Sequence, residues 1–161
     1  MTTSTRFAQR RAVSSQRSPA TAAVPLVCGA MLCLAVTVIH VLDQGGFALQ
    51  DPGYIGSLYL ALEVGGVVAA GMLMFQRPAS DRSRVTRRLA PGWWVALGVA
   101  VGPLVGYLSS RSIGLPGYTS DIGDWTEPLG LASLAVEGAL LVLTLGVLAA
   151  HFATGRGSRP A

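Results

Sequence analysis

A run of apolar residues at positions 54–75, YIGSLYLALEVGGVVAAGMLMF, most constrains what this chain can fold into. It is long enough for one helix to cross the hydrocarbon core of a bilayer, which takes about 20 residues. The run holds one ionisable residue, Glu63. Because an ionised carboxylate at the centre of a membrane helix costs about 2.5–3.5 kcal/mol, we expect Glu63 to face protein or a water-filled cavity.

Three further apolar runs predict an all-α fold, an integral membrane bundle of four transmembrane helices at about 24–42, 54–75, 92–110 and 129–152. Only 12% of the 161 residues are charged, whereas a soluble domain carries about 25%. Residues 22–152 are therefore predicted to form one transmembrane domain. The polar residues 1–21 predict a disordered tail, and 153–161 a second short tail.

The arginines predict how the chain is threaded through the membrane. All twelve basic residues are Arg, and eleven of them lie in the two tails and in the 76–90 connection. Because arginine-rich short loops stay inside, both termini and this connection are predicted to be cytoplasmic, in a plasma-membrane protein. The arginines then fix the orientation of the chain in the membrane and contact lipid headgroups, and we expect no nucleic-acid partner.

Two carboxylates fall at equal depth in this topology. Glu63 and Glu137 each lie nine residues from the outer end of their helix, about 13 Å at 1.5 Å per residue. Tyr59 and Ser133 lie one turn above them, and His40 lies near the outer end of the first span. These five residues are predicted to line an outward-open polar pocket, whose mouth would be capped by Asp43, Arg111 and an acidic loop.

A histidine with two carboxylates suits a divalent metal or a proton relay, so His40, Glu63 and Glu137 are candidate metal ligands. The alternative is that each glutamate only fixes helix packing. Haem is disfavoured because His40 and His151 fall at opposite membrane faces. No catalytic residue is predicted, since the chain lacks a nucleophile elbow, an HExxH motif and a phosphate loop.

Small residues predict where helices approach closely. Gly98, Gly102 and Gly106 recur every four residues in the third span and predict a stripe for helix packing. The second span has small residues at the same spacing, among them Gly66. In the loop before the fourth span, we expect Arg111 to pair with Asp121 or Asp124.

Several short patterns resemble small four-span membrane proteins common in actinobacteria. They are VIHVLDQGG at 38–46, YIGSLYLALE at 54–63, RSIGLPG at 111–117 and WTEPLG at 125–130. The likeness covers most of 36–150 and implies the fold and topology of that group, without an activity. The group often carries an amide side chain near the position of Glu63.

Two function classes remain open. The first is a non-enzymatic accessory or interaction subunit that binds a membrane-protein partner, or a second copy of itself, through glycine stripes or outer loops. The second is a protein that binds or transports protons or a cation with the outer-half pocket around Glu63 and Glu137. Enzyme activity ranks third. Because four helices leave little room for a conduction path, a transporter would have to oligomerise.

Overall fold

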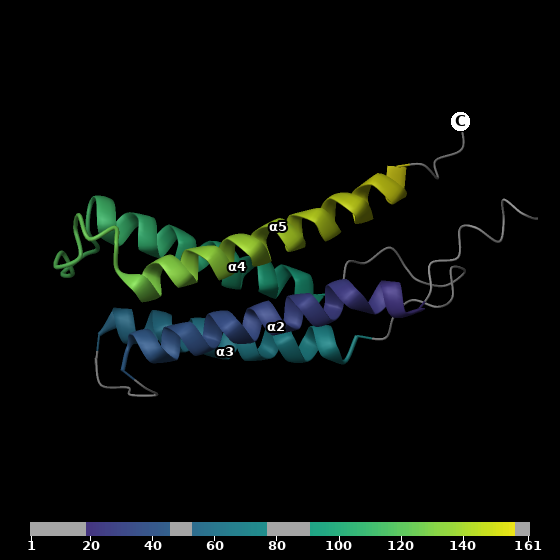
Figure 1. The fold of residues 1–161 in the computed structure, drawn as a ribbon, viewed down its shortest axis with the longest axis horizontal. Helices are drawn as coiled ribbons and strands as arrows, with labels where there is room; N and C mark the ends of the chain where they lie inside the picture. The colour runs from purple at the N-terminus through teal and green to yellow at the C-terminus, as the bar shows by residue number, and fades with distance from the viewer. Residues whose placement is uncertain (1–18, 46–52, 77–90, 157–161) are drawn as a thin grey trace, which may run out of the picture.

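The computed structural model describes residues 19–45, 53–76 and 91–156, and in these ranges the chain forms four helices and no strand (Figure 1). The helices are α2 (Pro19–Asp43), α3 (Tyr54–Met74), α4 (Pro91–Ser112) and α5 (Pro128–Arg156). Each contains a stretch that is long and apolar enough to cross a membrane: Ala23–Asp43, Tyr54–Met74, Pro91–Ser112 and Pro128–Ala153. The predicted bundle of four membrane-capable helices is thus confirmed.

The ends of the bundle differ in detail from the prediction. Helix α2 begins at Pro19, so residues 19–21 are helical and do not belong to a disordered tail. The segment PATAA contains three alanines, which have the best helix propensity. Helix α5 likewise continues to Arg156, into the second predicted tail. Residues 1–18 and 157–161 and most of the basic connection, 77–90, lie outside the described residues.

Proline marks the start of three helices. Pro19, Pro91 and Pro128 are the first residues of α2, α4 and α5, a position where proline's fixed φ suits the helix and its missing N–H costs no hydrogen bond. At α5, the carboxylate of Glu127 also accepts hydrogen bonds from the backbone N–H groups of Leu129 at 3.0 Å and Gly130 at 2.6 Å. A carboxylate is favoured there by the helix dipole.

The four helices form a ring in which sequence neighbours are also spatial neighbours. Helix α2 packs against α3 and α5, and α4 packs against the same two helices. The pair α2 and α3 lies below the pair α4 and α5 in Figure 1, and the start of α2 lies at the same end as the end of α5. Helices α3 and α5, which carry Glu63 and Glu137, are therefore diagonal to each other.

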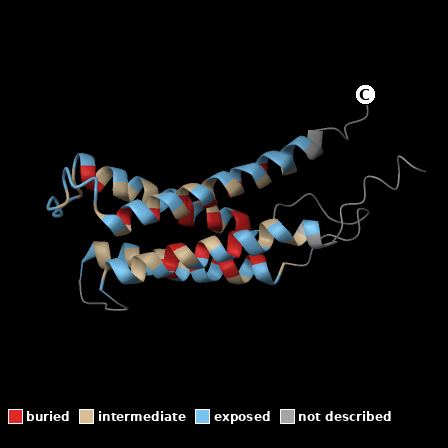
Figure 2. Ribbon diagram, in the orientation of Figure 1, coloured by how far each residue is buried: buried red, intermediate tan, exposed pale blue. Residues whose placement is uncertain are grey.

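Close packing is concentrated in the half of the bundle away from the α4–α5 connection. The buried core comes from the middle of α2, the end of α3, the start of α4 and the middle of α5: Ala30, Cys33, Val36, Ala69, Ala70, Leu73, Trp93, Ala96, Val99, Ala100 and Leu140. Figure 2 shows these buried stretches on the helix faces that meet near the centre. Most of these side chains are small, so the helix backbones approach closely there.

Glycines permit the closest approaches in this half. A Cβ added at Gly66 of α3 would overlap the Thr37 hydroxyl of α2 and lie 3.0 Å from the carbonyl oxygen of Cys33. At Gly29 it would lie 3.0 Å from the Trp93 ring. The prediction that small residues of 54–75 admit a neighbouring helix is confirmed at Gly66.

Candidate functional site

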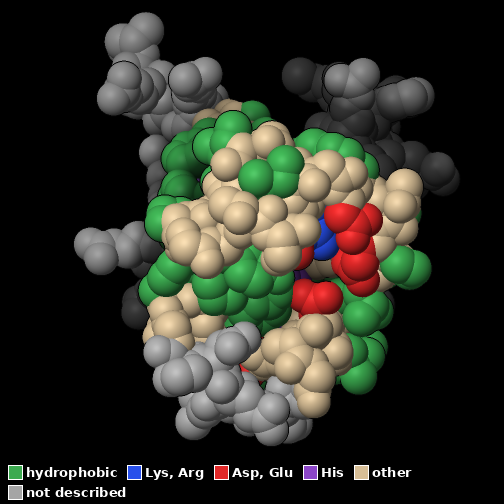
Figure 3. Space-filling model, turned by 90° about the vertical axis from the view of Figure 1, so that its left-hand side faces the viewer, with side chains coloured by type: hydrophobic (Ala, Val, Ile, Leu, Met, Phe, Trp, Pro, Cys, Tyr) green, Lys and Arg blue, Asp and Glu red, His purple; other side chains and the backbone are tan. Residues whose placement is uncertain are grey.

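The other half of the bundle contains a cavity of about 890 Å³ that opens beside the α4–α5 connection, residues 113–127. All four helices and the connection contribute to its wall. Figure 3 looks at this end of the molecule, where acidic side chains gather beside one basic side chain around a hollow. We call this end of the cavity the mouth.

Arg111, the last basic residue of α4, organises the mouth. Its side chain is paired with Asp121, as expected from the sequence, and its Nη2 lies 3.7 Å from Glu127 Oε2. The guanidinium also stacks over the Tyr107 ring, with its carbon 5.1 Å from the ring centre. These contacts leave Arg111 only 8% exposed, and its Nε has no hydrogen-bond partner. The α4–α5 connection is thus built around a buried cation.

The connection itself is folded by a tight turn. Leu115 and Tyr118 exchange two backbone hydrogen bonds of 2.8 Å, and Gly114 next to this turn has φ +79°, a value that glycine adopts without strain. The Tyr54 hydroxyl of α3 donates to the carbonyl of Pro116 at 2.6 Å, which ties the turn to the neighbouring helix pair. Burial raises the pKa of Tyr118, so its phenol is neutral at neutral pH.

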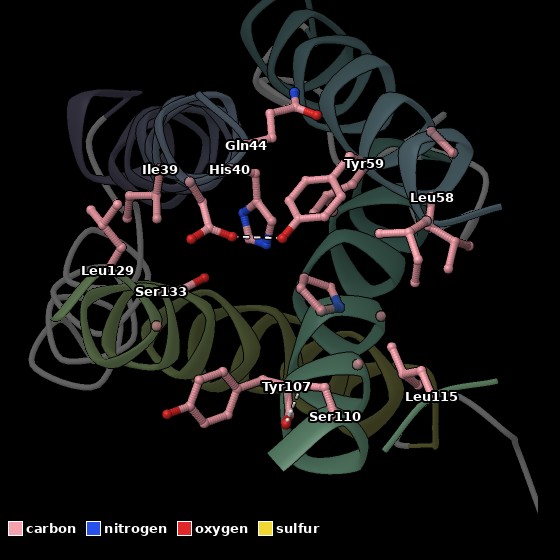
Figure 4. Close-up of a pocket in the computed structure, with 18 of the residues that line it drawn as sticks. Ile39, His40, Gln44, Leu58, Tyr59, Tyr107, Ser110, Leu115, Leu129 and Ser133 are labelled. Atoms are coloured by element: carbon pink, nitrogen blue, oxygen red, sulfur yellow. Dashed lines mark hydrogen bonds between the residues drawn. The ribbon is translucent and has the colours of Figure 1, made fainter. Parts of the chain in front are cut away.

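His40 and Tyr59 form the inner wall of the mouth, where they point toward each other from α2 and α3 (Figure 4). Their ring centres are 5.7 Å apart, and the Tyr59 hydroxyl donates to Asp43 Oδ2 at 2.6 Å. His40 Nδ1 lies 3.0 Å from the carbonyl oxygen of Val36. Because a carbonyl only accepts, Nδ1 carries a hydrogen, and Nε2 is the nitrogen that faces the bundle interior.

Glu137 lies directly behind this wall and is only 1% exposed. Its Oε1 accepts a hydrogen bond from the Ser133 hydroxyl and lies 3.6 Å from His40 Nε2, an ion-pair distance. Its second oxygen, Oε2, is buried and has no hydrogen-bond partner in the part of the chain that the structure describes. Such an oxygen is costly to bury unless a proton or a cation compensates it.

Glu63 has a different partner from Glu137. It is 7% exposed and accepts a hydrogen bond from the Gln44 side chain, which follows the last residue of α2. The structure therefore brings His40, Ser133 and Glu137 together and places Glu63 with Gln44. Within the described residues, no group of three or more His, Cys, Asp or Glu side chains is placed to hold a metal ion.

The other predicted pocket residues meet at the cavity. Tyr59, Ser133, Asp43 and Arg111 all line it, together with His40. Glu63 and Glu137 do not line it themselves. The sequence reading missed Gln44, which lies beside the His40–Asp43 segment, and the two lining tyrosines, Tyr107 and Tyr118. These three residues could have been found from their positions, because each lies within a few residues of a residue that was predicted to form the pocket or its mouth.

The glycine stripe of α4 requires a correction. A Cβ added at Gly98, Gly102 or Gly106 would meet no atom of the described residues within 4 Å, so these glycines do not pack against α2, α3 or α5. They form part of the cavity wall instead. A spacing of four residues places small side chains on one helix face, and here that face borders an open space.

The charge of the lining is negative. Among the described lining residues there are four carboxylates and one guanidinium, a formal charge of −3 with His40 neutral. Asp121 is compensated by Arg111, and Glu127 by the start of α5. Asp43 and Asp124 remain as charges at the mouth that these contacts do not neutralise.

Comparison of this chain with protein-family models, with curated proteins and with solved structures finds no match.

Proposed function

We propose that this protein is a multi-pass plasma-membrane protein that binds a small cation in the cavity between its four helices. The observation that carries the proposal is the charge of the lining, where four carboxylates face one guanidinium that is already paired. A cleft of one sign with low-dielectric walls concentrates counter-ions. The mouth therefore attracts a cation and repels an anion.

The buried pair His40–Glu137 strengthens this preference. Glu137 lies behind the lining residues His40 and Ser133, and its Oε2 has no partner. A cation in the cavity lowers the cost of an ionised carboxylate at this depth, because opposite charges favour each other's charged form. In its absence, a proton on the carboxyl group serves the same purpose.

The orientation is part of the proposal. Eleven of the twelve arginines belong to the tails and the 76–90 connection, so these segments are placed in the cytoplasm and the mouth faces outward. The likeness to four-span actinobacterial membrane proteins supports the same topology. The cation would then reach the cavity from the outer surface.

Binding of tetramethylammonium tests the proposal. Calorimetry on protein in neutral detergent should show saturable binding, whereas tert-butanol, a neutral molecule of similar size, should not bind. Replacing Asp43 and Asp124 together by Asn keeps their size, and should weaken tetramethylammonium binding by about tenfold, as expected when about 1.4 kcal/mol of attraction is lost. Equal binding by wild type and this double variant would contradict the proposed site.

A second candidate function is that of an accessory subunit. The exposed stripe Gly98, Gly102 and Gly106 favours it, because a partner helix could approach α4 there without meeting a side chain. Cross-linking in membranes tests this alternative. A cross-linked species that disappears in Gly102→Leu, in a variant that still binds tetramethylammonium, would favour the accessory role.

A further inference from the structure

The cavity changes character along its length. Its mouth is lined by charged and aromatic side chains, but its far end is lined only by apolar residues and glycine: Leu62, Gly65, Val95, Gly98 and Val99. From Gly98 to Arg111 this wall extends about 20 Å along α4 at 1.5 Å per residue. The cavity therefore combines a polar end with a long apolar arm.

The arm is a groove between α3 and α4. Its α4 wall carries the glycines at 98, 102 and 106, beside which the space for a side chain is empty. Ile55, Leu58 and Leu62 of α3 form the facing wall. The groove ends where the two helices meet, since a Cβ on Gly65 would lie 3.5 Å from Val99 Cγ2. Leu58 is 58% exposed, so the groove borders the surroundings of the bundle.

We propose that this cavity binds an amphiphilic ammonium ion, with its charged head at the mouth and a single alkyl chain in the groove. The inference rests on the proposed cation site and adds the chemical class of the ligand. Asp43 and Asp124 supply the charge at the mouth, and the rings of Tyr59, Tyr107 and Tyr118 line the same end. Aromatic rings attract alkylammonium groups through their electron-rich faces.

The buried carboxylate behind the mouth gives independent support. Glu137 is only 1% exposed, and its Oε1 contacts the lining residues His40 and Ser133. Its Oε2 has no hydrogen-bond partner among the described residues. A cation bound at the head site favours the ionised form of this carboxylate, which then adds negative potential at the inner end of the site. A partner helix lying along the glycine stripe would cover α4 alone and would leave His40, Asp43 and this carboxylate without a ligand.

Three probes distinguish the contribution of the charged head group to binding from that of the alkyl chain. Dodecyltrimethylammonium carries both, tetramethylammonium carries the head alone, and dodecyl sulfate carries the same chain with the opposite charge. Each is titrated into the full-length protein in dodecyl maltoside, with protein-free micelles as the blank. We expect saturable binding of dodecyltrimethylammonium and none of dodecyl sulfate.

Two matched leucine variants locate the chain. Gly102→Leu fills the groove, while Gly146→Leu of α5 introduces the same side chain where a Cβ also meets no atom within 4 Å, outside the cavity lining. Gly102→Leu should weaken dodecyltrimethylammonium binding by about tenfold or more, because the chain and the leucine compete for the same volume. Tetramethylammonium, which has no chain, should lose much less affinity than dodecyltrimethylammonium in Gly102→Leu, and Gly146→Leu should change the binding of neither.

The outcomes separate this inference from the proposed function. If tetramethylammonium binding depends on Asp43 and Asp124 but Gly102→Leu does not weaken dodecyltrimethylammonium binding, the cation site stands and the amphiphile is refuted. Equal binding of dodecyl sulfate would refute both. Displacement of dodecyltrimethylammonium by lysophosphatidylethanolamine, a lipid amine with one chain, would identify a lipid as the source of the head group, and its failure would indicate a free alkylammonium ion.

Discussion

The contact between Gly66 and Thr37 allows a quantitative test of how the closed half of the bundle is held. In Gly66→Ala the new methyl group would overlap the Thr37 hydroxyl and lie 3.0 Å from the Cys33 carbonyl oxygen. Thr37 would have to rotate and lose its 3.1 Å hydrogen bond to that carbonyl, and the backbone of α2 would have to move. Overpacking of this kind costs about 1–3 kcal/mol.

Gly71→Ala is the matched control on the same helix. A Cβ there would meet no atom within 4 Å, so the change should only add helix propensity, about 0.5–1 kcal/mol of stability. The same gain partly offsets the clash at Gly66. Because this gain is common to both variants, the clash alone sets the difference, and we expect Gly66→Ala to unfold more easily than Gly71→Ala by about 1–3 kcal/mol.

Reversible unfolding in mixed micelles, followed by circular dichroism, measures this difference. Adding Thr37→Ala to Gly66→Ala removes the overlapping hydroxyl and should recover part of the loss, which appears as a coupling energy in a double-mutant cycle. If the two alanine variants are equally stable, or if Thr37→Ala does not couple to Gly66→Ala, the reasoning about this contact is wrong.

The remaining predictions concern the mouth. Arg111→Gln removes the cation that pairs with Asp121 and Glu127, both of which are partly exposed, and should cost about 1.5–3 kcal/mol; limited proteolysis should then cut the 113–127 connection faster than in wild type, and unchanged cutting would contradict its role. Glu127→Ala removes the cap that accepts from Leu129 and Gly130 and should destabilise the bundle by about 1 kcal/mol in the same unfolding assay, whereas full stability would show that the cap is dispensable. Ser120→Cys places a thiol on the exposed surface of the connection and should react with a membrane-impermeant maleimide in intact cells, with wild type as the background; labelling only after lysis would reverse the proposed orientation.

Helix positions could be predicted from the sequence because the apolar runs alone set them. The span at 54–75 becomes α3 at Tyr54–Met74, and the lining residues His40, Tyr59 and Ser133 follow from their positions near the ends of the spans. Depth along a helix is fixed by 1.5 Å per residue and needs no tertiary information.

What each side chain contacts could not be predicted, because contacts depend on how the helices are arranged and rotated about their axes. Equal depth suggested one pocket for Glu63 and Glu137, but α3 and α5 are diagonal, and each glutamate has its own partner, Gln44 or His40. Gly66 and Gly102 illustrate the same limit. Both belong to small-residue patterns, yet one touches a neighbouring helix and the other borders the cavity.

The uneven distribution of packing along the bundle has a mechanical consequence. The α2–α3 and α4–α5 pairs are joined firmly where Gly29 of α2 meets the Trp93 ring of α4, while at the opposite end the hydrogen bond from Tyr54 to Pro116 links them. Thermal motion should therefore rotate the two helix pairs about their closely packed end, which widens and narrows the mouth of the cavity. Breaking that link with Tyr54→Phe would widen the opening without disturbing the pivot.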